Sequence, residues 1–190
     1  LYANISSYQI IKKNEDNKTT PTAFPYITYT TGLQENNYLK YENSYQTYNI
    51  FRDISTDDHA QRQQKLSHQF TAEKNIYKYK SKIDFKLELH SQYYNTENKK
   101  INLVDETNEY LRFFPMSGIF LETPFIHKDN GLLLTPKISF IANSGQSNTN
   151  KISNEESTNN SYTISNQNEL NRYNGTDKLD NTKRLMYGID

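Results

Sequence analysis

The chain contains no cysteine and no tryptophan, and only six glycines and five prolines stand among its 190 residues. The absence of cysteine excludes disulfides, reactive thiolates and cysteine-bound metals within this chain. Basic and acidic residues balance at 22 each, so charge alone does not predict binding to a nucleic acid. No stretch reaches the ~18 consecutive apolar residues of a transmembrane helix, although alternating membrane strands would escape that test.

The composition is polar and yet rich in aromatic residues. Hydrophobic residues make up 34% of the chain, and its mean hydropathy is −0.96. Such values are typical of partly disordered chains, but 16 tyrosines and 9 phenylalanines argue against disorder. A tyrosine-rich chain favours amphipathic β-structure. Because the chain starts at Leu1 and no signal segment follows, we expect it to be part of a longer protein.

The clearest pattern is an alternation of two side-chain types from Tyr77 to Tyr93. Apolar or small residues occupy the odd positions, and charged or polar residues occupy the even positions. About 17 residues at 3.3 Å each extend roughly 55 Å, which gives a height of about 43 Å at a tilt of about 40°. Globular strands usually contain about 3–10 residues, whereas a tilted strand crosses a bilayer with about 9–11.

The two faces of this expected strand would meet different surroundings in a membrane barrel. Tyrosines at both ends of an aliphatic series are typical of interfacial girdles. We expect lipid to contact Tyr79, Ile83, Phe85, Leu87, Leu89 and Tyr93. We expect the lumen to contact Lys78, Lys80, Lys82, Asp84, Lys86 and Glu88. A lysine facing lipid near the midplane would cost about 2–4 kcal/mol, which is why the lysines are placed inside.

Period-two alternation recurs along the chain, while helical periodicity is hard to find. Strands are predicted at residues 2–13, 22–33, 38–51, 64–73, 76–94, 110–127, 132–142 and 183–190. Short connections such as 74–75 alternate with long ones such as 95–109 and the loop 143–182, as in outer-membrane barrels. The predicted fold is an all-β, antiparallel transmembrane barrel segment over 1–190. Alone, its eight or so strands would form an open curved sheet.

Three prolines fall inside predicted strands, where a proline removes a donor from the hydrogen-bond ladder. They are Pro115, Pro124 and Pro136. We therefore expect the sixth strand to be interrupted near Pro115 and Gly118.

Two alternatives to this barrel segment remain at this point. A soluble β-protein, such as an adhesin module, explains the alternation equally well, but it explains neither the strand length nor the alternating connections. Another outer-membrane barrel, such as a porin-like channel or a receptor, fits both patterns.

Catalytic and metal-binding patterns are sparse. The four histidines fall in separate elements without ligand spacing, and no Gly-x-Ser-x-Gly elbow occurs. The sequence Asp57-Asp58-His59 is the nearest candidate for acid–base chemistry, and a solvated loop explains it better. We expect no catalytic residues, no metal and no cofactor, and we rank an outer-membrane hydrolase well below the other functions.

Four short elements near the end of the chain occur in a distinctive order. They are Leu134-Thr135-Pro136-Lys137, Asn154-Glu155-Glu156-Ser157, Asn171-Arg172-Tyr173-Asn174-Gly175-Thr176-Asp177-Lys178, and Arg184-Leu185-Met186-Tyr187-Gly188. Their order and spacing over about residues 132–190 resemble a signature of the LptD family, also called Imp or OstA. This family assembles lipopolysaccharide at the outer membrane.

The resemblance implies a fold, a function and partners. LptD-like proteins form a large barrel in the Gram-negative outer membrane and carry a periplasmic β-jelly-roll domain. With an LptE lipoprotein plug they receive lipopolysaccharide from periplasmic bridge proteins and insert it into the outer leaflet. The chain would then be a slice of the barrel wall without the jelly-roll and the lateral gate. Its expected partners are lipopolysaccharide, an LptE-like plug, the bridge proteins through the missing domain, and outer-membrane lipid, with no nucleic acid.

The charges of the long loop suggest two arrangements. In the first, the loop folds into or over the lumen and is held by an ion pair between Arg172 and Asp177, a pairing that suits the guanidinium group. In the second, the loop and its charges, including Glu155 and Lys178, are solvated. Gly175 would serve a turn that needs a positive φ.

Overall fold

The computed structural model describes residues 2–7, 17–128, 131–145, 150–157 and 166–189. Its strands are β1 (Tyr2–Ser7), β2 (Thr22–Thr30), β3 (Gln34–Glu35), β4 (Lys40–Phe51), β5 (Arg62–Lys78), β6 (Ser81–Ile101), β7 (Val104–Glu122), β8 (Phe125–Ile126), β9 (Leu133–Leu134), β10 (Pro136–Asn143) and β11 (Lys183–Ile189). A short 3-10 helix spans Asn17–Thr19. Within the described ranges, no helix is long and apolar enough to cross a membrane.

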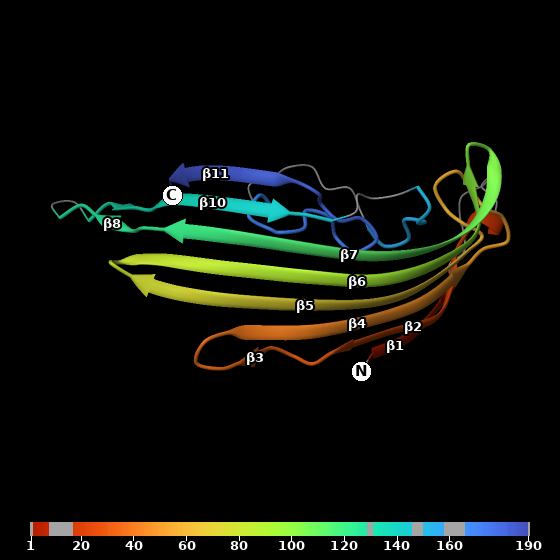
Figure 1. Ribbon diagram of the computed structural model, residues 1–190, viewed down its shortest axis with the longest axis horizontal. Coiled ribbons are helices and arrows are strands. Elements are labelled where there is room, and N and C mark those ends of the chain that lie inside the picture. Colours follow the sequence, from red (N-terminus) through yellow and green to blue (C-terminus); the bar gives the residue numbers. More distant parts are fainter. Residues whose placement is uncertain (1, 8–16, 129–130, 146–149, 158–165, 190) are drawn as a thin grey trace.

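The long strands form one antiparallel sheet in the order β1-β2-β4-β5-β6-β7-β10-β11, and β3 pairs with β4 beside this path. The strands curve together, and β1 and β11 lie at opposite edges (Figure 1). Each main strand pairs with its neighbours along the chain, which is the meander expected of a barrel wall. The prediction of an all-β, antiparallel, open curved sheet is confirmed.

The predicted turn at residues 74–75 is wrong. β5 continues to Lys78, and the chain turns at Tyr79 and Lys80, whose φ angles are 52° and 65°. Two-residue turns with positive φ match the twist of paired strands. The observed register places Ile76 opposite Ile83 and Phe70 opposite Leu89, so the apolar residues of both strands share one face.

The predicted long loop at residues 95–109 is also wrong. β6 continues to Ile101 and β7 begins at Val104, so this region is a long hairpin that turns at Asn102 and Leu103. Its tip rises at one end of the sheet (Figure 1). A shift of register between Thr96 and Lys99 marks a bulge in the hairpin. Polar residues of β6 and β7 pair in this hairpin and extend the hydrogen-bond ladder. The polar composition of the segment had indicated a loop instead.

Pro115 does not interrupt β7. Its carbonyl oxygen accepts a hydrogen bond from the Ser144 N–H, on the side of β7 that faces β10. Because N and C=O of one residue point to the same side of a strand, the proline nitrogen also faces that side, where the ladder ends at Asn143. Gly118 also lies within the continuous strand. Pro136 is the first residue of β10, a position that tolerates proline.

The other predicted strands are close to those observed. β2 ends at Thr30, β4 begins at Lys40, and the strand expected at 132–142 divides into β9 and β10. The last strand ends at Ile189. The first strand is observed over Tyr2–Ser7, and the remainder of the range predicted for it lies outside the described residues.

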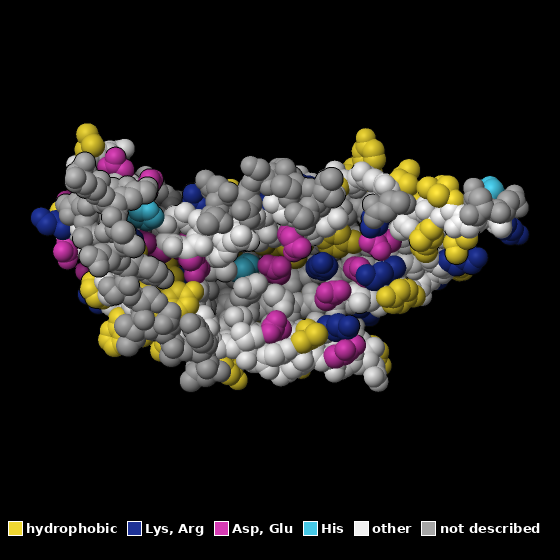
Figure 2. Space-filling model, turned by 180° about the vertical axis from the view of Figure 1, so that it is seen from behind, with side chains coloured by type: hydrophobic (Ala, Val, Ile, Leu, Met, Phe, Trp, Pro, Cys, Tyr) yellow, Lys and Arg dark blue, Asp and Glu magenta, His cyan; other side chains and the backbone are white. Residues whose placement is uncertain are grey.

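The two faces of β6 differ as the alternation predicted. Lys82, Asp84, Lys86 and Glu88 share one face, on which the loop between β10 and β11 is seated. Charged side chains surround the hollowed middle of this face (Figure 2). The opposite face carries Ile83, Phe85, Leu87, Leu89 and Tyr93, several of which are exposed. We refer to these as the loop face and the outward face.

Three residues of the predicted faces lie elsewhere. Lys78 belongs to β5 and pairs with Ser81, so it lies on the outward face and not with Lys82. Tyr79 and Lys80 form the turn and belong to neither face of β6. The cause is the turn itself, because the two residues that reverse the chain shift the alternation between β5 and β6.

An apolar cluster fixes part of the β10–β11 loop to the sheet. Leu170 and Leu179 from the loop pack against side chains of β7 and β10, namely Phe114, Met116, Phe120 and Ile141. Gly118 makes this approach possible, because a Cβ atom there would lie 2.8 Å from Leu170 Cδ2. Burial of apolar surface therefore holds the segment around Leu170 and Leu179 on the sheet.

Candidate functional site

A lysine of the sheet lies at the centre of the polar contacts between the β10–β11 loop and the loop face. Lys65 of β5 has a fully buried side chain, with 0% exposed. Its ammonium donates to the Glu156 carboxylate, to Thr176 Oγ1 at 2.6 Å and to Asp177 Oδ1 at 3.0 Å. A buried ammonium needs such partners, since each lost charge-assisted bond would leave it poorly solvated.

Asp177 of the loop collects hydrogen bonds from three strands and from the loop itself. Its carboxylate, 0% exposed, accepts from the hydroxyls of Tyr48 in β4 and Tyr94 in β6, each at 3.1 Å. It also accepts from the backbone N–H groups of Glu155 at 2.9 Å and Glu156 at 3.1 Å. One side chain thus joins two segments of the loop, those of Glu155 and Asp177, to the wall.

Arg112 of β7 completes the attachment through its planar guanidinium group. Nε donates to Gln92 Oε1 at 2.7 Å, and Nη1 donates to the backbone oxygen of Asp177 at 2.9 Å. Nη2 donates to the backbone oxygen of Thr176 at 2.6 Å and to the Tyr94 hydroxyl at 3.1 Å. This fixed fork of donors suits two adjacent carbonyl groups in a way that a lysine ammonium does not.

A second buried ion pair holds the first arm of the loop. Arg52 donates from Nη1 and Nη2 to the two carboxylate oxygens of Glu155, at 2.9 and 2.7 Å. Burial alone would raise the pKa of Glu155, but side-chain interactions with Arg52, His59 and Ser153 lower it from 4.5 to about 2. The pKa of Glu156 is lowered as well, because the charge and hydrogen bond of Lys65 outweigh burial. Both carboxylates are therefore ionised at neutral pH.

The two motif segments of the loop also bind each other. Ser157 Oγ accepts from the Lys178 N–H at 2.9 Å, and the Asn154 side chain both donates to and accepts from the backbone of Ser157. Asn171 binds the backbone of Tyr173, Gly175 and Asp180. Gly175 has a φ of +80°, which confirms the predicted need for a positive φ at this turn.

The predicted ion pair between Arg172 and Asp177 is wrong. Arg172 instead donates to both oxygens of Asp180, at 2.6 Å from Nε and 3.0 Å from Nη2. Asp177 is held by Lys65 and the two tyrosines, which leaves Arg172 for the carboxylate three residues later. The loop does fold over one face of the sheet, as the first of the two arrangements supposed.

Acid is expected to loosen this attachment. A carboxylate whose pKa is depressed in the folded state stabilises that state above its unfolded pKa, and the stabilisation is lost as pH falls through the folded pKa. For Glu155 the window runs from about pH 4.5 down to about 2 and is worth roughly 3 kcal/mol. A fluorophore on an Asn174→Cys variant should report a fixed loop from pH 8 to 5 and increasing mobility below. Glu155→Gln should already be mobile at pH 7 and change less on acidification, and identical profiles would contradict the assignment.

Gly175→Ala is expected to displace the loop by two separate effects. The left-handed backbone costs an alanine about 1–2 kcal/mol. A Cβ at this position would also lie 2.6 Å from the backbone oxygen of Glu156. Gly32 offers a matched control, since its φ is +74° and a Cβ there would meet no atom within 4 Å. Proteolysis of the loop should therefore increase more in Gly175→Ala than in Gly32→Ala, and equal effects would show that the contact with Glu156 is unimportant.

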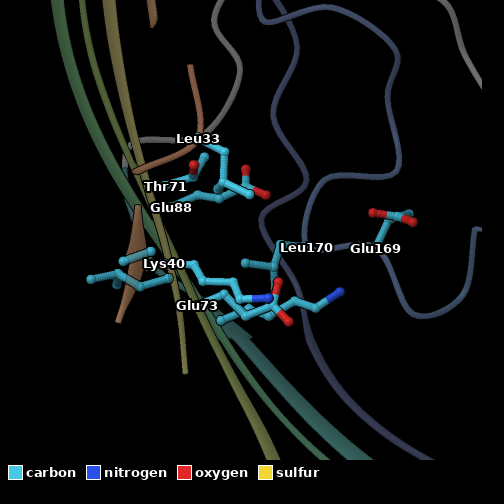
Figure 3. Close-up of a pocket in the computed structure, with 10 residues that line it drawn as sticks. Leu33, Lys40, Thr71, Glu73, Glu88, Glu169 and Leu170 are labelled. Atoms are coloured by element: carbon cyan, nitrogen blue, oxygen red, sulfur yellow. The ribbon is translucent and has the colours of Figure 1, made fainter. Parts of the chain in front are cut away.

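A hollow of about 340 Å³ opens between the sheet and the loop. Lys40, Thr71, Glu73 and Glu88 line it from the sheet, while Glu169 and Leu170 line it from the loop (Figure 3). Lys40 and Glu73 point toward Leu170 in this view. Lys86 also lines the hollow, and Leu33 and Leu87 add apolar surface. The cavity therefore presents charges of both signs beside aliphatic groups.

The connection between β4 and β5, which contains His59, helps to hold the β10–β11 loop. His59 Nδ1 lies 3.7 Å from Glu155 Oε1, and the Ala60 carbonyl accepts from Arg52 Nη1 at 2.8 Å. No cluster of three or more potential metal ligands occurs among the residues described. The expectation that the protein is not an enzyme and binds no cofactor remains a prediction.

The wall residues of the site were not identified from the sequence. In the sequence Lys65 is one of several polar residues on the face that also carries Gln63 and Ser67. Arg112 is a single cation within Tyr110–Phe114. An isolated arginine between apolar residues of a strand was the available signal, because such a charge needs a partner from outside the strand. The motif residues Glu155, Glu156 and Asp177 were identified, and the structure brings them together.

One match with a known protein family shows to which family the chain belongs. The family model described as LPS transport system D, LptD, matches residues 1–190, the whole chain. The chain belongs to the LptD family. Comparison with curated proteins finds no match, and neither does comparison with solved structures. The LptD family transports lipopolysaccharide and acts in assembly of the Gram-negative outer membrane, so the long β-sheet described above is that of a lipopolysaccharide transport protein.

Proposed function

We propose that this chain is part of the wall of an outer-membrane barrel that guides lipopolysaccharide into the outer leaflet. The observation that carries the proposal is the contrast between the two faces of one long sheet. The outward face presents an apolar series from Ile83 to Tyr93, which is about the length that crosses a bilayer at a tilt. The loop face carries the charges and the attached loop.

On this proposal the loop face lines the lumen, and the β10–β11 loop narrows it from the external end. The short turn at Tyr79 and Lys80 would lie in the periplasm, and the hairpin tip at Asn102 and Leu103 outside. The buried contacts of Lys65 and Arg112 hold the loop in place against the flow of solvent and cargo.

The hollow beneath the loop suits one part of the cargo. The ammonium groups of Lys40 and Lys86 would bind the anionic groups of lipopolysaccharide, and Leu33 and Leu170 would contact less polar parts. An LptE-like lipoprotein would occupy the lumen beside the loop. Periplasmic Lpt bridge proteins would deliver cargo through an N-terminal domain of the full protein.

A photo-crosslinking amino acid in the full-length protein, expressed in its own bacterium, tests the proposal. At Lys86, on the loop face, it should capture lipopolysaccharide while delivery continues and lose it when delivery stops. Ile76 provides the control, since it lies on the outward face near the short-turn end, where the surrounding leaflet contains phospholipid. Capture at Ile76 but not at Lys86 would refute the assignment of the faces. Normal surface lipopolysaccharide after depletion, together with reduced uptake of small solutes, would favour the porin-like alternative.

A further inference from the structure

A two-stranded ribbon extends beyond the end of the sheet. β8 and β9 continue β7 and β10 in the same register, since Phe125 lies opposite Leu134 as Glu122 lies opposite Lys137. The ribbon projects past the turn between β5 and β6 (Figure 1). Because the register continues, Phe125 and Leu134 have the same orientation as Leu121 and Ile138 of the outward face.

The stem of this ribbon lacks a polar face. Phe125 and Leu134 pair on one side, and Ile126 and Leu133 pair on the other, with exposed fractions from 45% at Leu134 to 72% at Ile126. Hydrophobic side chains gather at this narrow end of the molecule (Figure 2). A ribbon in water would need at least one polar face, so the stem calls for an apolar environment.

The tip of the ribbon is polar. The exposed residues His127 and Lys128 lead into it, and Gly131 follows. The His127 N–H donates to the Leu132 carbonyl at 2.8 Å, and the Gly131 N–H donates to the His127 carbonyl at 3.0 Å. An apolar stem that ends in a polar tip matches the order of acyl chains and headgroups in a leaflet.

The register of the sheet shows where the apolar part of the outward face begins on each strand. On β6 and β7 the large apolar residues of this face start at Tyr93 and Leu111, which lie opposite each other, whereas on β10 and β11 they start at Phe140 and Leu185, with Lys183 before Leu185. Phe140 lies in the row of Phe85, which is eight residues along β6 from Tyr93 (93 to 85). The apolar region therefore shifts toward the short-turn end between β7 and β10, as expected where tilted strands cross a bilayer.

An apolar series of the same length on β10 must therefore extend into the ribbon. A series of about 9–11 residues that starts at Phe140 passes Ile138 and reaches Leu134, six residues further (140 to 134). On the neighbouring side, β5 and β6 have already turned at Tyr79 and Lys80. No strand of that hairpin flanks the stem at this level, and the exposed fractions of its four apolar residues show that both of its faces are accessible.

We propose that the β8–β9 ribbon inserts into the leaflet on the short-turn side of the membrane. Acyl chains cover both faces of its stem, and the tip lies among the headgroups. This inference rests on the proposed function, because it takes the outward face of the wall to contact lipid. It adds a membrane-inserted element below the wall on the side of β7, β10 and β11.

Single cysteines test the insertion, since this segment has none of its own. The full-length protein, with any other cysteines removed, is labelled with a small fluorophore at Phe125, Ile126 or Leu134 and reconstituted in phosphatidylcholine–phosphatidylglycerol vesicles. Brominated lipid should quench each label at least threefold more than iodide does. Phe85→Cys on the outward face and Leu103→Cys at the opposite hairpin tip serve as lipid and water references.

Each outcome bears on a different statement. Quenching by iodide at Phe125 and Leu134 would place the ribbon in water and overturn the insertion. Quenching by neither agent would show that a protein segment covers the ribbon, which also overturns it. If only Ile126 is quenched by iodide, the claim that both faces meet acyl chains is wrong. Failure of brominated lipid to quench Phe85→Cys would instead refute the proposed membrane wall itself.

Discussion

Replacing Lys65 with methionine is expected to release the β10–β11 loop and to lower the free energy of unfolding by about 3–5 kcal/mol. Methionine has a similar length and removes only the charge and the donors. The Asp177 carboxylate is fully buried, and that of Glu156 is largely buried. Without the ammonium both lose their main cationic partner, and an uncompensated buried charge is much more costly than a missing surface pair.

The matched control for this experiment is Lys82→Met on the same face of the sheet. Lys82 pairs with Asp84 at 2.6 Å, but its side chain is 34% exposed, so the loss should be about 0–1 kcal/mol. Resistance to unfolding in detergent and proteolysis of the loop in the full-length protein report the two effects. Similar losses for both variants would show that the loop does not depend on Lys65.

A double variant separates the pair from its surroundings. Asp177→Asn removes the negative charge that Lys65 faces, while most of the other donors keep an oxygen to bind. If the two side chains act as a pair, Asp177→Asn should cost less in the Lys65→Met background than in the native chain. Additive costs would mean that each side chain is stabilised mainly by other groups.

Six of the charges between the loop and the sheet balance one another, which helps to explain how they can be buried. Arg52, Lys65 and Arg112 contribute three positive charges, and Glu155, Glu156 and Asp177 contribute three negative charges. Lys65 and Arg112 come from strands, Arg52 directly follows β4, and each anion comes from the loop. Removal of the loop would therefore take away the carboxylates that Arg52 and Lys65 bind and the backbone oxygens that Arg112 binds.

The fold was largely predictable because alternation is a local property of the sequence. The faces of β6 follow directly from which residues are apolar, and the prediction held from Lys82 to Tyr93. Turn positions were less predictable because they depend on the pairing of two strands. Nothing local distinguishes residues 74–75 from Tyr79 and Lys80, whereas the register that pairs Ile76 with Ile83 does.

The site was predictable on the loop and not on the wall. The motif containing Glu155, Glu156 and Asp177 was recognised, but its partner Lys65 lies 112 residues before Asp177. Arg172 was assigned to Asp177 because the two are close in sequence, while the folded loop places Asp180 beside Arg172. The long loop folds back over the sheet and so brings its carboxylates to strands far away in the sequence. The distance between two residues in the sequence does not show which strand the loop will reach.

Replacing Phe85 or Leu87 with lysine is expected to impair assembly of the full-length protein into the outer membrane far more than Lys82→Ala does. Phe85 and Leu87 lie on the outward face, within the series from Ile83 to Tyr93. A lysine that faces lipid there costs about 2–4 kcal/mol near the midplane. Leu87, nearer the middle of the series, should show the larger effect of the two.

The fraction of folded protein in outer-membrane extracts, measured by heat-dependent mobility in gels, provides the readout. Lys82→Ala removes a charge from the loop face and breaks a partly exposed pair with Asp84, so assembly should remain near the native level. All three positions belong to the same strand, so the contrast tests which face of that strand meets lipid. Equal and mild losses in the three variants would therefore place the outward face away from lipid, and a large loss for Lys82→Ala alone would reverse the assignment of the two faces.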